Sequence, residues 1–136
     1  MNFKKIFCSS ILVLLGIIPM VIGCDNSAPA NVTGTVTLDG KPLPRAKVIF
    51  SPVDGSRSSI GVTDSQGKYK LRFSASTQGA TVGEHKVEIR TTPTESDSSV
   101  KIKPVEIVPA RYNKSTELKQ TLKKGTQVIN FDLSSQ

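Results

Sequence analysis

Apolar and polar residues alternate with a period of two over most of the chain after residue 31. The alternation is clearest at residues 32–38, 69–73, 87–89 and 128–133, and shorter apolar segments at 46–50, 60–62 and 105–107 suggest further strands. Alternation places every second side chain in a core and the others in water, as in antiparallel sheets. Because many short strands occur here without an amphipathic helix, the sequence predicts an all-β fold, an antiparallel β-sandwich of seven to eight strands.

Turn residues separate these runs. Asp39-Gly40 follows the first run and is typical of a tight hairpin turn whose two central residues both take positive φ. Residues 64–67 are expected to close a second hairpin, with Asp64 accepting hydrogen bonds from its own backbone and Gly67 in the left-handed conformation. Pro42 and Pro44 lack a backbone N–H, so we place them in an edge segment.

Residues 115–125 fit two interpretations. Ser115 as an N-cap, Leu118 and Leu122 four residues apart, and a closing Gly125 favour a helix. The same residues also alternate, with Leu118, Gln120 and Leu122 on one side. We predict a strand, because a sandwich requires a partner for the run at 128–133.

The N-terminal residues have the pattern of an export signal. Lys4 and Lys5 precede an almost continuous apolar run at residues 6–22, and such charges stay on the cytoplasmic side while the apolar segment enters the bilayer. As a helix this run would span about 25 Å, short of a hydrocarbon core of about 30 Å, and Pro19 would disturb its last turn. A removable signal therefore fits better than an uncleaved anchor, in which Cys24 would be incidental.

The end of this segment, Val21-Ile22-Gly23-Cys24, resembles the lipobox of bacterial lipoproteins. The resemblance implies that the Cys24 thiol accepts a diacylglyceryl group and that cleavage after Gly23 makes Cys24 the acylated first residue. Two or more acyl chains, at about 0.8 kcal/mol per buried methylene, hold a protein stably to a bilayer. Cys8 would be removed with the signal, which leaves no pair of cysteines for an intramolecular disulfide. Asp25 resembles an inner-membrane retention signal of some Gram-negative bacteria, and inner and outer membrane both stay open.

The chain is expected to have three parts. They are a lipoprotein signal peptide at residues 1–23, a lipidated tether at 24–30 and one β-sandwich domain at 31–134. A length of 136 residues suffices for one ordinary domain and not for two. With one His, two Cys and no Trp, the composition excludes a Cys/His metal module and a disulfide scaffold.

Segments of this domain resemble the carboxypeptidase regulatory-like domain, a transthyretin (prealbumin)-like β-sandwich. They include Gly61-Val-Thr-Asp-Ser-Gln-Gly-Lys-Tyr69 and residues 32–44 and 46–50, while residues 82–89, 107–113 and 128–133 resemble small bacterial lipoproteins that carry this domain. The resemblance implies the fold over 31–134, but the domain occurs on many unrelated proteins and implies no activity. We expect Gly34 and Gly61 to leave room where strands approach. We expect Tyr69 and Tyr112 to pack their rings and direct their hydroxyls to backbone groups.

The sequence offers few residues for a catalytic site. His85 is the only imidazole, so a Ser-His-Asp arrangement would have to use it. Alternation places His85 on the same face as Val87 and Ile89, where a packed histidine is expected. Hydroxyisourate hydrolases of transthyretin-like fold end in a Tyr-Arg-Gly-Ser motif, whereas this chain ends in Phe-Asp-Leu-Ser-Ser-Gln. We predict no enzymatic activity, no catalytic residue and no cofactor.

Metal binding and covalent cross-linking are also disfavoured. Asp39, Asp54 and Asp64 would be the candidates for Ca²⁺, but no run supplies the alternating oxygens of a calcium loop, so we predict Asx turns and no metal site. An isopeptide bond would need a Lys, a buried carboxylate and Asn113 or Asn130. The carboxylates fall on predicted solvent faces.

The chain is basic, with 18 Lys and Arg against 11 Asp and Glu. The basic residues form two groups, one with Lys68, Lys70 and Arg72 and the other with Lys119, Lys123 and Lys124. Such stripes can contact anionic headgroups or wall polymers, or serve only as solvated, aggregation-resistant faces. Export and the lack of exposed aromatic residues disfavour nucleic-acid binding, and the lack of Trp disfavours a sugar platform.

The sequence therefore predicts a lipoprotein on the exported side of a membrane, held there by acyl chains on Cys24. Its domain is expected to be a non-enzymatic structural or protein-interaction module, with an envelope protein as partner and no small-molecule substrate. The alternative is an accessory protein that binds a ligand or ion, namely an anionic polymer, a lipid headgroup or Ca²⁺.

Overall fold

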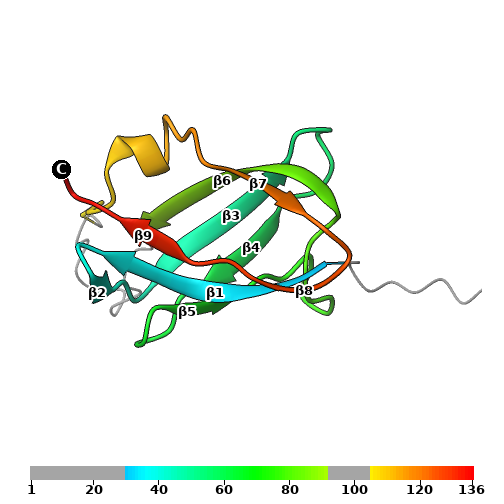
Figure 1. Ribbon diagram of the computed structural model, residues 1–136, viewed down its shortest axis with the longest axis horizontal. Coiled ribbons are helices and arrows are strands. Elements are labelled where there is room, and N and C mark those ends of the chain that lie inside the picture. Colours follow the sequence, from blue (N-terminus) through cyan, green and yellow to red (C-terminus); the bar gives the residue numbers. More distant parts are fainter. Residues whose placement is uncertain (1–29, 92–104) are drawn as a thin grey trace, which may run out of the picture.

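The computed structural model describes residues 30–91 and 105–136, which form two β-sheets packed face to face (Figure 1). In the first sheet, β1 (Ala30–Leu38) lies in the centre, with β5 (Lys68–Lys70) and β2 (Lys41–Pro42) along one edge and β8 (Gly125–Val128) and β9 (Phe131–Leu133) along the other. The second sheet has the order β4 (Ser59–Val62), β3 (Ala46–Pro52), β6 (Gly83–Thr91) and β7 (Lys119–Leu122). A single turn of 3₁₀ helix, Ala110–Tyr112, completes the described elements. The all-β prediction is confirmed.

The core lies between the two sheets and follows the predicted alternation. Along β1, β3 and β6, every second side chain is buried, and these faces meet Leu71 and the buried residues of β9. Three aromatic rings join the sheets, because Phe50 of β3 lies 6.1 Å from Phe131, which lies 6.3 Å from Tyr69. Fully burying side chains of this size stabilises a fold by about 1.5–3 kcal/mol each, which makes this face the main source of stability.

The first sheet is mixed, and the expectation of a purely antiparallel sandwich was wrong. β8 and β9 both run parallel to β1, with Ala30 opposite Gly125 and Val36 opposite Phe131. The reason is the connection after β7: the chain leaves the second sheet at the end of the sandwich where β1 begins, and so enters the first sheet in the direction of β1. The described residues contain nine strand segments rather than seven or eight.

Residues 115–125 contain a strand, as predicted, but its partner differs. β7 pairs antiparallel with β6, Lys119 opposite Lys86 and Leu122 opposite Gly83, whereas the run at 128–133 pairs with β1. Leu122 is buried and Lys119 and Thr121 are exposed, in the expected alternation. Local alternation thus predicted the strand conformation of β7 and its inward face, but not the strand with which β7 pairs.

The expected strand at 105–107 is wrong. Glu106 Oε1 accepts hydrogen bonds from the Thr91 N–H at 3.1 Å and the Val108 N–H at 3.0 Å. A side-chain carboxylate therefore takes the place of a strand partner, and Val105 and Ile107 are exposed.

Asp39-Gly40 closes the first hairpin as predicted, with φ of 51° and 76°, and Gly67 takes the expected left-handed conformation at 72°. The hairpin expected at residues 64–67 is wrong, because β5 pairs with β1 rather than with β4 and the turn therefore joins the two sheets. β1 begins at Ala30, one residue before the expected start of the domain. The signal segment and Cys24 lie outside the described residues, and within the described ranges no helix is long and apolar enough to span a membrane.

Candidate functional site

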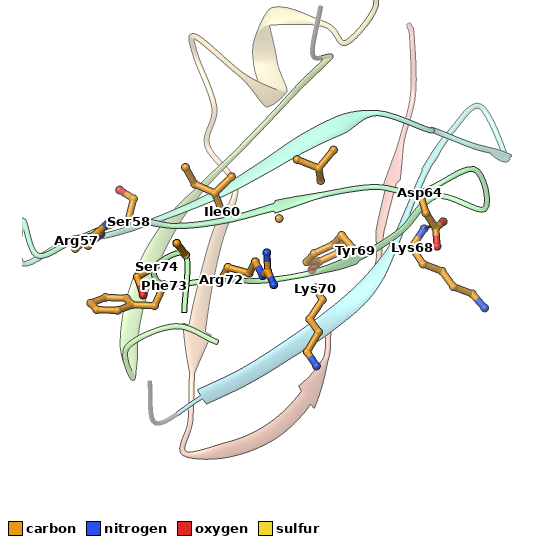
Figure 2. A pocket seen from close by; sticks show the side chains of 13 residues that line it. Arg57, Ser58, Ile60, Asp64, Lys68, Tyr69, Lys70, Arg72, Phe73 and Ser74 are labelled. Carbon is orange, nitrogen blue, oxygen red and sulfur yellow. Dashed lines mark hydrogen bonds between the residues drawn. The ribbon is translucent and has the colours of Figure 1, made fainter. Parts of the chain in front are cut away.

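A groove of about 770 Å³ lies between β4 and β5, where the two sheets meet (Figure 2). The two strands touch at its ends. Ile60 and Arg72 exchange two backbone hydrogen bonds of 2.9 Å at one end, and the Asp64 N–H donates to the Lys68 carbonyl at 2.9 Å at the other. Between these points the strands separate into different sheets, and side chains rather than a backbone ladder line the opening.

Tyr69 forms the floor of the groove. Its side chain is buried, and its ring lies between Gly61 of β4 and Gly34 of β1. A Cβ at residue 61 would lie 3.1 Å from the ring and one at residue 34 would lie 2.9 Å from it, so both glycines make room for the ring, as expected. The Tyr69 hydroxyl donates to the Ile129 carbonyl at 2.8 Å. Burial raises the pKa of Tyr69 above its usual value, so this hydroxyl stays a neutral donor at neutral pH.

Basic side chains form one wall of the groove. Lys68 and Lys70 lie on β5 and Arg72 follows two residues after it, and all three are exposed, as the sequence predicted. On one strand, side chains on the same face are about 6.8 Å apart, which is the spacing expected for Lys68 and Lys70. Arg57 adds a fourth cation at the end of the groove, where its guanidinium lies 5.8 Å from the centre of the Phe73 ring.

Apolar side chains form the opposite wall. Ile60 is 40% exposed and Val62 is 52% exposed, and both point away from the core on the outer face of β4. Their neighbours Ser59 and Gly61 face inward instead, because the Tyr69 ring fills the space that a larger residue at position 61 would need. Two aliphatic side chains beside three exposed cations suit a ligand with both negative charge and apolar groups.

Asp64 is the acidic residue in the lining, and its carboxylate is already occupied. Asp64 Oδ1 accepts from the Gln66 N–H at 2.8 Å and from the Lys68 N–H at 3.0 Å. The Asp64 charge therefore closes the turn that holds the start of β5, and the remainder of the lining is uncharged or basic.

His85 is a packed histidine, as expected. It is fully buried, and its ring centre lies 5.9 Å from that of Phe50. Nδ1 lies 3.0 Å from the Gly83 carbonyl, which can only accept, so Nδ1 carries the proton, and Nε2 lies 3.3 Å from Thr81 Oγ1. Both ring nitrogens are thus engaged with neighbouring groups in the interior. This arrangement fixes the chain between Thr81 and His85 at the start of β6 and presents no free imidazole nitrogen to solvent.

The three turn aspartates lie at separate places and bond to backbone. Asp54 Oδ1 accepts from the Ser56 N–H at 2.9 Å in an Asx turn, and Asp39 Oδ1 accepts from the Ser135 N–H at 2.9 Å. Hydrogen bonds with the side chain and backbone of Ser56 lower the pKa of Asp54, and those with the backbone and side chain of Ser135 lower the pKa of Asp39. Within residues 30–91 and 105–136, no three His, Cys, Asp or Glu side chains are grouped so that they could hold a metal ion.

The remaining candidates have structural partners. Asn113 Nδ2 donates to the Val108 carbonyl at 2.9 Å, and Asn130 Oδ1 accepts from the Thr35 N–H at 2.9 Å, so both amides hold the backbone. Tyr112 accepts at its hydroxyl from the Ser134 N–H at 3.3 Å, which agrees with the expected backbone contact. Lys119 pairs with Glu84 at 3.3 Å, while Lys123 and Lys124 are exposed on the turn before β8.

Sequence reasoning identified the cations of the groove but not its apolar wall. The signal for that wall lies in residues 59–62, Ser-Ile-Gly-Val, where the small residues alternate with the large ones. In a strand against a core the large residues normally face inward, and here a neighbouring tyrosine reverses this.

Searches against protein-family models, curated proteins and solved structures return no significant match to this chain.

Proposed function

We propose that this chain is a bacterial lipoprotein, anchored through acyl chains on Cys24, whose domain is a non-enzymatic protein-interaction module of the carboxypeptidase regulatory-like type. The lipobox-like Val21-Ile22-Gly23-Cys24 after a basic and apolar leader supports the anchor and an exported location. Two packed β-sheets support the fold class. A binding role rather than catalysis is supported by the groove, whose charged groups are cations at the rim and one aspartate that already accepts two backbone hydrogen bonds.

The partner that best fits the groove is an extended protein segment with acidic residues at alternate positions. In such a segment, side chains on one face repeat every 6.8 Å or so, which is the strand spacing of Lys68 and Lys70 on β5, and Arg72 adds a third cation two residues further on. The exposed aliphatic wall of Ile60 and Val62 would contact apolar side chains of the same segment. The match between the alternating acidic side chains of such a segment and the cations of the groove is the single observation that carries this part of the proposal.

A synthetic peptide tests this binding mode directly. We expect a ten-residue peptide of alternating Glu and Val to bind the purified protein more tightly than a peptide of the same composition with its glutamates in one block. The double variant Lys68→Glu, Lys70→Glu should weaken binding of the alternating peptide about tenfold or more. The control Lys86→Glu, Lys114→Glu makes the same change of charge at exposed positions outside the groove and should weaken it far less.

Equal binding of the two peptides, or equal loss in both double variants, would show a general response to charge and contradict the assigned groove. Titration with anionic lipid vesicles and with a polyanionic glycan in the same assay covers the other ligands that a basic face can take. Tighter binding of either than of the alternating peptide would overturn the assignment to a protein partner.

A further inference from the structure

The start of β1 fixes the end of the sandwich that lies nearest to the proposed anchor. Ala30 pairs with Gly125 at the start of β8 and forms a bridge with Ala80, so three segments meet where the chain enters the domain. Figure 1 shows the starts of β1 and β8 side by side at this end, which we call the tether pole. β6 begins and β7 ends here as well, with Gly83 opposite Leu122.

Exposed lysines gather at the tether pole. Lys123 and Lys124 form the turn between β7 and β8, directly before the residue that pairs with Ala30. This turn is held on both sides, since Leu122 is buried and the Gln127 side chain donates to the Lys123 carbonyl at 2.6 Å. The two ammonium groups therefore extend from a fixed turn beside the entry of the chain.

Exposed valines accompany these charges. Val82 is 47% exposed and directly precedes Gly83, and Val53 is 61% exposed in the loop after β3, where its N–H donates to the Glu84 carbonyl at 3.0 Å. Apolar tips beside cations are the combination that favours the interfacial region of a bilayer.

The acidic groups at this pole are already committed. The Glu84 carboxylate pairs with Lys119 at 3.3 Å, and Asp54 accepts the Ser56 N–H in its own turn. Neither Lys123 nor Lys124 forms an ion pair with a carboxylate among the described residues. The positive charge of the turn therefore stays available for an outside partner.

We propose that the tether pole rests on an anionic phospholipid surface, with Lys123 and Lys124 at the headgroups and Val53 and Val82 at the interface. This inference rests on the proposed acylation of Cys24. The six residue steps from Cys24 to Ala30 span at most about 20 Å even when fully extended. A bilayer that holds the anchor is thus always within reach of this pole. Contact would orient the domain so that the far end of the groove, at Asp64 and Lys68, points away from the membrane.

Lipid quenching of a site-specific fluorophore tests this orientation. In the acylated full chain Cys24 is blocked, so a single Val82→Cys or Ser65→Cys substitution gives one labelling position at the tether pole or in the exposed turn before β5. Each labelled protein is reconstituted in vesicles containing a bromine-labelled lipid, with or without phosphatidylglycerol. Mass spectrometry of each preparation verifies the acyl chains.

We expect quenching at position 82 to exceed quenching at position 65 at least about twofold in phosphatidylglycerol vesicles. The difference should shrink in pure phosphatidylcholine and in 1 M salt, where charges are screened beyond about 3 Å. The double variant Lys123→Gln, Lys124→Gln should remove most of the difference, whereas Lys68→Gln, Lys70→Gln should keep it.

Equal quenching at the two positions in an acylated protein would overturn this inference and leave the proposed function standing. A label at position 82 that is shielded from a water-soluble quencher without being quenched by lipid would indicate that protein covers the pole, and would also overturn it. A chain recovered from membranes without acyl chains would refute the proposed function and this inference together.

Discussion

The Tyr69 hydroxyl donates a hydrogen bond of 2.8 Å to the carbonyl of Ile129, 60 residues further along the chain. Tyr69 belongs to one edge of the first sheet and Ile129 to the other, so the side chain reaches across the central strand β1 at Gly34. A Cβ at position 34 would lie only 1.7 Å from the Ile129 carbonyl oxygen. One residue without a side chain thus lets a tyrosine join both edges of the sheet and form the floor of the groove.

Substitutions at Tyr69 and Gly34 should destabilise the domain to different extents. Tyr69→Phe removes one hydrogen bond and leaves a partly buried carbonyl without its donor, which should lower the free energy of unfolding by about 0.5–1.5 kcal/mol. Gly34→Ala forces β1 and the β8–β9 edge apart, and we expect it to destabilise the domain more than Tyr69→Phe does. Urea denaturation monitored by circular dichroism measures both. An alanine at position 34 that costs less than the loss of the hydroxyl would contradict the close approach described here.

Alkaline pH should destabilise the domain through Tyr69. Burial raises the pKa of Tyr69 in the folded protein above the unfolded value of about 10. Above that pH the unfolded chain loses a proton that the folded chain retains, so the free energy of unfolding falls as pH rises beyond about 10.

The phenylalanine variant provides the comparison. Between pH 9 and 11 the unfolding free energy of Tyr69→Phe should fall less steeply than that of the natural chain. Tyr112→Phe should not reduce the fall. Hydrogen bonding, mainly from the Ser134 backbone, lowers the pKa of Tyr112, so ionisation of Tyr112 raises the free energy of unfolding with pH instead of lowering it. Equal slopes for Tyr69→Phe and the natural chain would show that Tyr69 ionises as freely in the folded state as in the unfolded one.

His85 should behave as a core residue. His85→Ala leaves a cavity beside Phe50 and removes the partners of Gly83 and Thr81, so we expect a loss of about 2–4 kcal/mol in unfolding free energy. In the natural chain, nitrogen NMR at neutral pH should show the proton on Nδ1. A proton found on Nε2 would contradict the hydrogen bond to the Gly83 carbonyl.

The C-terminal residues should loosen in acid through Asp39. The hydrogen bond from the Ser135 N–H, more than the nearby Lys41 and Arg111, lowers the pKa of Asp39 below 3.8. Because this pKa is lower in the folded protein than in the unfolded chain, ionised Asp39 stabilises the contact at pH values above the unfolded pKa of about 3.8. The contact weakens as the pH falls below that value. Amide exchange of Ser135 should therefore be less protected in Asp39→Ala than in the natural chain at neutral pH, with Asp54→Ala as the control. Equal protection in the three proteins would show that Asp39 does not hold the C-terminus.

Local patterns were sufficient to predict the central strands and the core. β1, β3 and β6 have strict alternation, and their buried faces are those that the sequence indicates. The Asp39-Gly40 turn also forms as predicted, since an Asp-Gly pair favours the two successive positive φ values that this turn needs. Such features are fixed within a few residues and can be recognised one segment at a time.

Features that depend on distant residues could not be predicted in this way. Nothing in the sequence of β8 or β9 indicates a parallel partner, because that direction follows from where β7 ends in space. The outward direction of Ile60 and Val62 depends on a tyrosine ring from another strand, and the missing strand at 105–107 depends on the bonds of the Glu106 carboxylate to Thr91. The apolar wall of the groove is therefore a feature that depends on distant residues.

The mass and location of the mature chain test the central proposal most directly. Intact-protein mass spectrometry of the membrane fraction should show a chain that begins at Cys24 and carries acyl chains, while Cys24→Ala should accumulate as an uncleaved precursor. A membrane-bound chain with an intact Met1, a cleaved chain with an unmodified Cys24, or a chain found free in the cytosol would contradict the account.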